Sequence, residues 1–127
     1  MKFKSLIPLL DVSDVESSIS FYSEALGFKI EDQLSWNGKT DWALLRAGKT
    51  KVMLSQGSGR TQKVEQIAPN SVLFLYPEDT EWLYSTLDAK GYQMTNVQKG
   101  QSGTKEFCLT DPDGYILWFS SKSIGDM

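Results

Sequence analysis

The chain carries the stretch TDPDGYILWF (residues 110–119), in which a turn signal runs straight into an apolar segment. Pro112 and Gly114 suit the backbone angles of a tight turn, and the two aspartates between Thr110 and Gly114 can cap it. The apolar segment predicts a strand over residues 115–120. Trp118 poses the functional question, because it either fills a core or lines a pocket in place of a group that would do chemistry.

A strand-helix pattern occurs twice along the chain. The first copy is SLIPLLDVSDVESSISFYSEALGF (residues 5–28), and the second is NSVLFLYPEDTEWLYSTLDAKGY (residues 70–92). Each has an apolar strand, an acidic helix start, an amphipathic helix and a Gly-aromatic pair at the end. Such self-similarity at half the chain length predicts a duplicated supersecondary unit.

The helix boundaries follow from local signals. Ser13 and Glu16 match the S-x-x-E capping box, which predicts the start of the first helix. Its apolar residues recur at helical spacing and predict one buried stripe, formed by Val15, Ile19, Tyr22 and Leu26. Gly27 suits the left-handed position that ends a helix. In the second copy Asp79 or Thr80 can cap, Leu83 and Leu87 form the stripe, and Gly91 ends the helix.

Three strand-like runs follow each helix. We predict strands over residues 29–33, 42–46 and 51–55 in the first half, and over 93–98, 106–110 and 115–120 in the second. The Asn37-Gly38 pair is a strong hairpin signal. We therefore expect one domain over 1–127, with a βαβββ unit at about 1–56, a polar linker at about 57–69 and a second unit at about 70–122.

Composition excludes several classes of function. A net charge of -3 argues against nucleic acid as the main partner. The apolar run after Lys2 and Lys4 is too short for a signal peptide, and no stretch is long enough to span a membrane. A single cysteine, Cys108, favours a reducing, cytoplasmic location. The chain contains no histidine, so histidine-based triads and histidine metal ligands are excluded.

The repeated β-α-β-β-β order resembles the vicinal oxygen chelate superfamily, which includes glyoxalase I, extradiol dioxygenases, fosfomycin resistance proteins and bleomycin resistance proteins. The resemblance covers nearly the whole chain. It rests on IPLLDVSDVESSISFYSEALGF, on the helix-Gly-aromatic unit of each half and on FCLTDPDGYILWF. It implies an α+β fold whose tandem βαβββ units form a curled mixed sheet around a cup-shaped cavity, often with strands exchanged across a dimer.

The resemblance also addresses the metal site. Metal-dependent members place their ligands at positions that correspond to Ile7, Ser71 and Trp118 of this chain. An apolar side chain, a hydroxyl and an indole provide neither carboxylate nor imidazole, so they do not form a divalent cation site. We therefore expect no metal and no cofactor, and we name no catalytic residue.

The same positions would instead line an apolar and aromatic cup. Strand alternation places Ile116 and Ser120 on the side of Trp118, and Leu117 and Phe119 against the helix. The predicted lining is Trp42, Trp118, Ile7, Leu9, Leu44, Met53, Ser71, Phe107 and Glu106. Rigid aromatic side chains make good stacking platforms for ligands. The alternative is that these residues only fill a core.

Within the superfamily the chain looks most like bleomycin resistance proteins, through TDWALLRAGKTKVMLSQG and KEFCLTDPDG. Trp42 falls where those proteins carry an aromatic that stacks on the drug. They sequester the drug between two subunits without chemistry, which implies antibiotic resistance, a small bleomycin-like ligand and a homodimer. The chain departs from that pattern at Ser102-Gly103, where the family has a tryptophan, and in its modest acidity.

Three functions remain open on the sequence. The favoured one is a metal-free protein that sequesters an aromatic, optionally cationic, small molecule. The second is a glyoxalase-like lyase or isomerase that uses Glu31 or Glu106 as base. The third is a structural or regulatory module with a filled pocket. We expect Asp41, Glu31 and Glu106 mainly to be solvated, and Cys108 to be a buried small hydrophobic residue.

Overall fold

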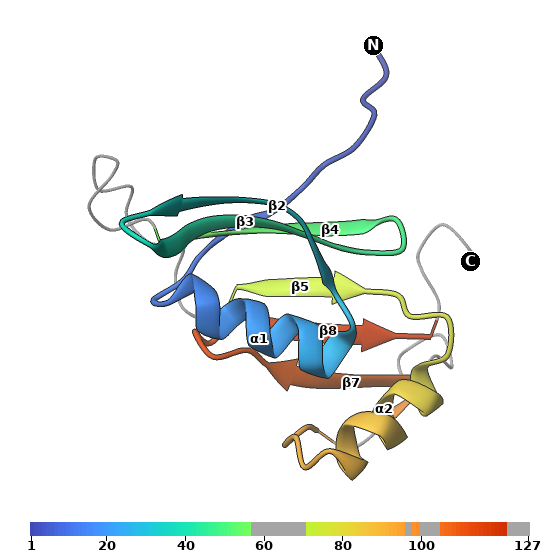
Figure 1. Cartoon of the computed structure of the whole chain (residues 1–127). Helices are drawn as coiled ribbons and strands as arrows, with labels where there is room; N and C mark the ends of the chain where they lie inside the picture. The colour runs from blue at the N-terminus through green and yellow to red at the C-terminus, as the bar shows by residue number, and fades with distance from the viewer. Residues whose placement is uncertain (57–70, 96–97, 100–104, 122–127) are drawn as a thin grey trace. The chain divides into compact units, whose positions relative to one another are not determined.

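The computed structural model describes residues 1–56, 71–95, 98–99 and 105–121 (Figure 1). The chain divides into two compact units, Met1–Ile67 and Ala68–Met127. The predicted linker at 57–69 and the Ser102-Gly103 pair lie outside the described residues. In the part of the chain that is described, none of the helices is both long and apolar enough to cross a membrane.

The first unit is a helix on a four-stranded mixed sheet with the order β1-β4-β3-β2, in which β1 runs parallel to β4 and the other pairs are antiparallel. Its elements, in chain order, are β1 (Leu9–Asp11), α1 (Val15–Leu26), β2 (Lys29–Trp36), β3 (Lys39–Ala47) and β4 (Thr50–Ser55).

Helix α1 begins one residue later than the capping box predicts. Asp14 is the N-cap, and its carboxylate accepts hydrogen bonds from the Glu16 N–H at 3.2 Å and the Ser17 hydroxyl at 2.8 Å. The predicted Ser13–Glu16 capping box is therefore wrong. The Glu16 carboxylate accepts instead from the Thr40 N–H on β3, at 3.4 Å. An ionised carboxylate is a stronger acceptor than a hydroxyl, which explains why Asp14 takes the role.

The buried stripe of α1 is rotated from the predicted one. Its buried residues are Val15, Ser18, Tyr22 and Ala25, whereas Ile19 and Leu26 are only half-buried. Small side chains at the centre of the stripe let the helix lie close to β3 and β4. The helix ends as predicted at Gly27, whose φ of 75° is left-handed. The ring of Phe28 then packs edge-on against Tyr22, at 5.8 Å between centroids.

The strands of this sheet alternate between a buried face and an open face. The face against α1 buries Leu10, Ala43, Leu45, Val52 and Leu54. Strands β2 and β3 extend beyond their predicted bounds and meet at the Asn37-Gly38 turn, where both residues have positive φ angles (52° and 75°). This tight turn matches the twist of the flanking strands, so pairing continues up to it.

The second unit repeats the arrangement, with a four-stranded sheet in the order β5-β8-β7-β6 and β5 parallel to β8. Its elements are β5 (Val72–Leu75), α2 (Thr80–Ala89), β6 (Gln98–Lys99), β7 (Lys105–Thr110) and β8 (Ile116–Ser120). The continuous strand predicted over 93–98 is wrong for the described residues, where only a bridge from Met94 to Leu109 precedes β6.

Helix α2 starts and ends near its predicted signals, whereas of its predicted stripe Leu87 is buried and Leu83 is only half-buried. The Asp79 carboxylate accepts from the Trp82 N–H at 3.0 Å, so Asp79 rather than Thr80 is the cap. After the helix Gly91 has a φ of 90°, and the Tyr92 N–H donates to the Leu87 carbonyl at 3.1 Å. The predicted α+β class with tandem βαβββ units is thus confirmed, with one four-stranded mixed sheet in each unit.

The core of the second unit lies between its sheet and α2. Phe107 stacks on Phe119 at 4.9 Å, and Tyr84 of α2 meets Phe107 edge-on at 5.2 Å. Leu109 and Leu117 are buried beside them. The predicted inward placement of Leu117 and Phe119 is therefore confirmed.

Candidate functional site

The open face of the first sheet carries a continuous apolar strip. Leu9, Met53 and Leu44 lie side by side on β1, β4 and β3, because each is registered with the next. Trp42 extends the strip one pleat further and is registered with Leu34 on β2. Leu9 is 51% and Leu34 is 56% exposed, whereas the three others are half-buried. The structure therefore brings most of the predicted apolar lining of this unit onto one surface.

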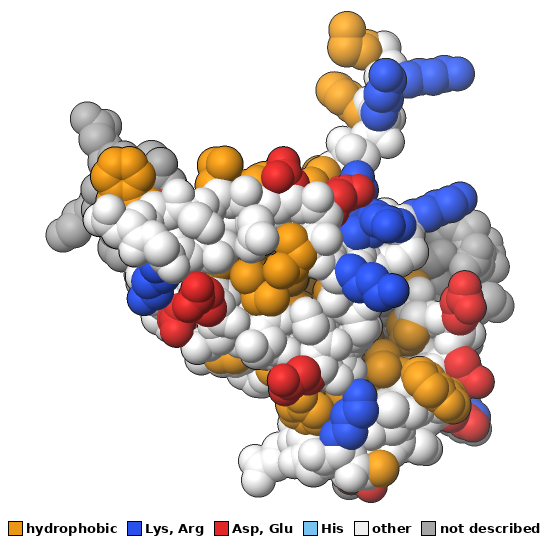
Figure 2. Space-filling view, viewed as in Figure 1, with side chains coloured by type: hydrophobic (Ala, Val, Ile, Leu, Met, Phe, Trp, Pro, Cys, Tyr) orange, Lys and Arg blue, Asp and Glu red, His pale blue; other side chains and the backbone are white. Residues whose placement is uncertain are grey.

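Ile7 lies two residues before Leu9, the first residue of β1. The Met53 N–H donates to the Pro8 carbonyl at 2.9 Å, so the chain is already held against β4 before β1 begins. Ile7 is half-buried. Further towards the N-terminus Phe3 and Leu6 are each 87% exposed, among basic side chains of the same segment (Figure 2).

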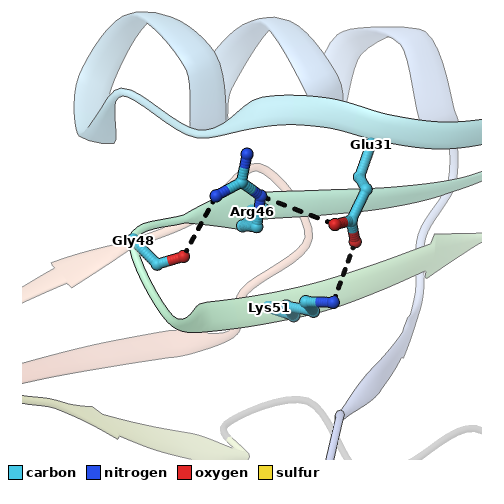
Figure 3. A network of polar contacts seen from close by, with 4 residues as sticks. All are labelled: Glu31, Arg46, Gly48 and Lys51. Carbon is cyan, nitrogen blue, oxygen red and sulfur yellow. Dashed lines mark hydrogen bonds and ion pairs between the residues drawn. The ribbon is translucent and has the colours of Figure 1, made fainter.

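The carboxylate of Glu31 lies at the far end of this sheet and serves as a counter-charge. It approaches Arg46 Nε at 3.5 Å and Lys51 Nζ at 3.1 Å, while Arg46 also donates to the Gly48 carbonyl at 3.5 Å (Figure 3). All three side chains are substantially exposed, so the network contributes little to stability. Two cations flank Glu31, which makes it a poor candidate for a general base.

The open face of the second sheet is built around Trp118. Trp118 lies on β8, registered between Phe74 of β5 and Cys108 of β7. The rings of Phe74 and Trp118 stack, with centroids 5.3 Å apart and planes inclined by 29°. Phe74 is 56% exposed and Trp118 is half-buried, so the pair presents ring surface outward. Phe74 was not predicted as a lining residue. Period-two alternation along NSVLFLY, which places Phe74 on the same face of the strand as Val72, is the sequence signal that could have identified it.

Glu106 lies on this face and bonds to Trp118. Its Oε1 accepts from Trp118 Nε1 at 3.1 Å, and its Oε2 accepts from the Ser120 hydroxyl at 3.4 Å. Glu106 is half-buried and Ser120 is 4% exposed. Glu106 is therefore not the solvated surface carboxylate that the sequence suggested, because the alternation of β7 puts it on the same face as the indole.

Cys108 lies beside the indole and is half-buried rather than fully buried. Burial raises the pKa of its thiol; a hydrogen bond with the Thr95 side chain lowers the pKa, and the negative charge of Glu106 raises it. The net pKa is raised, so the thiol stays protonated at neutral pH and is a weak nucleophile.

Two other predicted residues lie apart from the ring pair. Ser71 is half-buried just before β5, where its carbonyl accepts from the Ile116 N–H at 2.9 Å. Phe107 is 1% exposed and packs towards α2, on the opposite side of the sheet from Trp118. The ring surface of the second open face therefore comes from Phe74 and Trp118.

Comparison with known families decides the affiliation. A sequence model of the Glyoxalase/Bleomycin resistance protein/Dioxygenase superfamily matches residues 8–119. The chain belongs to this superfamily. The match spans both units, including the strip of the first sheet and the ring pair of the second.

Solved structures of the superfamily fold are similar over most of their length. A bleomycin resistance determinant encoded on transposon Tn5 has a TM-score of 0.73 at 21% identity, covering 96% of this chain and 100% of that one. TnmS3, an antibiotic-binding protein from Streptomyces sp. CB03234, has a TM-score of 0.78 at 18% identity, covering 97% and 99%. The bleomycin-binding protein from Streptomyces verticillus, complexed with copper(II)-bleomycin, has a TM-score of 0.69 at 24% identity, covering 97% and 99%. No curated protein matches the chain.

The side chains predicted to stand at the superfamily's metal-ligand positions do not fit a metal. Ile7 and Ser71 lie just before the first strand of each unit, and the Trp118 N–H donates to Glu106. None of the three side chains supplies a carboxylate, thiolate or imidazole. Over residues 1–56, 71–95 and 105–121, no three His, Cys, Asp or Glu side chains gather closely enough to hold an ion.

Proposed function

We propose that this superfamily member is a small-molecule binding protein of the bleomycin-resistance type, which sequesters a planar aromatic ligand without metal and without chemistry on it. The observation that carries the proposal is the stacked Phe74–Trp118 pair, which presents ring surface on an open sheet face. Core aromatics are normally covered, so an exposed stacked pair is a candidate contact surface.

The energetics favour a flat ligand. A ring that stacks on an aromatic pair gains about 0.5–1.5 kcal/mol beyond the burial of its area. The proposed contact surface of the second unit consists of Trp118, Phe74 and Ile116, with Glu106 bonded to the edge of the indole. The strip of Trp42, Leu44, Met53 and Leu9 is a separate candidate surface on the first unit, where each Å² of apolar area removed from water contributes about 25 cal/mol.

A positive charge on the ligand would add to its affinity. The Glu106 carboxylate lies at the edge of the indole, and the chain has a net charge of -3. Aromatic faces also attract cations. The similar solved structures support a small-molecule ligand, because they are a bleomycin resistance determinant, an antibiotic-binding protein and a bleomycin-binding protein in complex with copper(II)-bleomycin.

We extend the proposal to a cytoplasmic homodimer. The exposed side chain of Trp36 on the β2–β3 hairpin is suitable for a contact between copies. The presence of a single cysteine agrees with a reducing compartment. Sedimentation equilibrium of the wild type and of Trp36→Ser would test the dimer: it is contradicted if the wild type is monomeric at the concentrations used for binding.

The binding function can be tested by titrating the protein with metal-free bleomycin while following tryptophan fluorescence. We expect saturable quenching that is weakened in Trp118→Leu and in Trp42→Ala. Trp82→Phe is the matched control, because Trp82 lies on α2 and is 64% exposed. Equal binding by all three variants would contradict the assigned faces. Failure of the wild type to bind would exclude this drug, and other planar antibiotics would then be tested.

The alternative is a lyase or isomerase that uses a carboxylate as base. The half-buried Glu106 favours it, since it places a carboxylate on an open face. Two donors already engage that carboxylate, which suits a structural acceptor better than a base. Chromatography and NMR of ligand recovered after incubation separate the two functions: an unchanged structure supports binding, and a changed structure whose formation is lost in Glu106→Gln supports catalysis.

A further inference from the structure

The hydrogen bond between Glu106 and Trp118 has a role that goes beyond local packing. We infer that Glu106 is a positioning residue, which holds the Trp118 indole so that its face, and not its N–H, is offered to the ligand. This inference rests on the proposed function, because it concerns the same ring surface. It assigns to Glu106 an action through Trp118 rather than direct contact with the ligand.

Contacts on two sides restrain the indole. Its Nε1–H donates to Glu106 Oε1 at 3.1 Å, and its ring stacks on Phe74 at 5.3 Å. A tryptophan side chain rotates about only two torsions, so one edge contact and one face contact suffice to select a single orientation. Preorganisation of this kind lowers the ordering cost that a ligand would otherwise bear on binding.

Glu106 is itself held in place. Ser120 lies directly opposite Glu106 in the antiparallel β7–β8 pair, and its hydroxyl donates to Glu106 Oε2 at 3.4 Å. Trp118 is the diagonal neighbour, two residues away along β8, which is within reach of long side chains. Ser120 is 4% exposed, so this support lies beneath the face rather than in solvent. Ser120 therefore helps to hold Glu106 in place, and Glu106 in turn holds Trp118.

The arrangement determines what the platform can recognise. Because the indole has a single donor and Glu106 occupies it, Trp118 presents its π-face rather than a hydrogen-bond donor. A carboxylate that accepts from the N–H also increases the electron density of the ring. Electron-rich faces attract positively polarised groups, so the structure favours electron-poor planar rings as ligands over rings recognised through an acceptor atom.

The test compares Glu106→Leu, which removes the acceptor, with Glu106→Gln, which keeps one. In the ligand-free protein, the indole N–H signal of Trp118 in a ¹⁵N–¹H spectrum, assigned with Trp118→Phe, reports the bond directly. We expect Glu106→Leu to shift this signal and to speed its exchange with water, and Glu106→Gln to restore most of the wild-type behaviour. Affinity for metal-free bleomycin should fall about tenfold in Glu106→Leu, as expected for the loss of one hydrogen bond to a charged group.

Thermal unfolding and a control variant separate positioning from misfolding. Glu78→Leu removes an exposed carboxylate before α2 and should change neither the indole signal nor the affinity. Unchanged indole exchange in a folded Glu106→Leu protein would overturn the inference, and so would a changed indole with unchanged affinity. If the wild type does not bind bleomycin, the drug assignment fails separately; the affinities are then measured with quinoxaline as an electron-poor planar probe, and equal affinities for the wild type and Glu106→Leu would overturn the inference.

Discussion

The Oδ1 atom of Asp111 accepts a hydrogen bond from the backbone N–H of Tyr115 at 2.9 Å, across the turn that joins β7 to β8. The same atom accepts from the Asp113 N–H at 2.9 Å. The turn closes through the Gly114 N–H, which donates to the Asp111 carbonyl at 3.1 Å, with a φ of 92° at Gly114. Asp111 thereby sets the register in which Trp118 meets its neighbours.

We predict that Asp111→Ala destabilises the protein by about 2–3 kcal/mol, because two backbone donors lose their acceptor in a buried position. Asp111→Asn keeps one acceptor oxygen and should cost less. Urea unfolding followed by circular dichroism measures both changes. Asp88→Ala, on the exposed surface of α2, is the control. A loss for Asp111→Ala no larger than that of the control would contradict the assigned role.

Because Phe107 lies in the core, its substitution should lower the stability of the protein without weakening ligand binding. Removing this ring from between Tyr84 and Phe119 in Phe107→Ala should cost about 3–5 kcal/mol. In the milder Phe107→Leu the affinity for an aromatic ligand should be unchanged, because the side chain packs towards α2. Calorimetry of unfolding and fluorescence titration measure the two effects. Weaker binding by a folded Phe107→Leu protein would show that Phe107 contributes to the ligand site.

The Asp14 cap makes the stability of α1 depend on pH. The Ser17 hydroxyl is the largest cause that lowers the pKa of Asp14 from its ordinary 3.8, followed by the Glu16 N–H and the charge of Lys39. A lowered folded pKa means that the stabilisation is present above 3.8 and is lost as the pH falls through the folded value. In urea unfolding the wild type and Asp14→Asn should therefore converge in strong acid. A constant difference at all pH values would contradict this cause.

Cys108 should react slowly with alkylating agents. Burial is the largest cause of its raised pKa, and Glu106 adds a negative charge nearby. Iodoacetamide attacks the thiolate, so its rate should rise with pH to a midpoint above 9.0, the ordinary pKa of this thiol. Glu106→Gln should move the profile to lower pH. The chain has one cysteine, so mass spectrometry reads the reaction directly. A midpoint below that of a free thiol would refute the assigned environment.

Local signals in the sequence were sufficient for the class and order of the elements. The Asn37-Gly38 hairpin and the helix end at Gly27 were predicted correctly, and Asp79 was one of the two caps predicted for α2, because each depends on neighbours within a few residues. Alternation along β8 also placed Phe119 inside correctly. The extent of the strand predicted over 93–98 could not be predicted from local signals, because strand length depends on a partner elsewhere in the chain.

Other differences between prediction and structure arise where neighbouring residues suit the same structural role. Ser13 and Asp14 both suit a helix start, and the choice of Asp14 followed from the stronger acceptor. Similarly, the apolar residues of α1 predicted a stripe through Ile19, whereas the buried face runs through Ser18 and Ala25. How closely a helix approaches its sheet is a property of packing, which the spacing of apolar residues alone does not contain.

The sequence by itself determined the two βαβββ units, the turn at Asp111 and the side of β8 on which Trp118 lies, because backbone preferences and period-two alternation act locally. Only the tertiary structure decided what Trp118 touches. The parallel pairing of β5 with β8 brought Phe74 against its face, and the antiparallel register of β7 brought Glu106 to its N–H. Register joins residues that are distant in sequence, and one shifted residue would have turned either side chain to the opposite face.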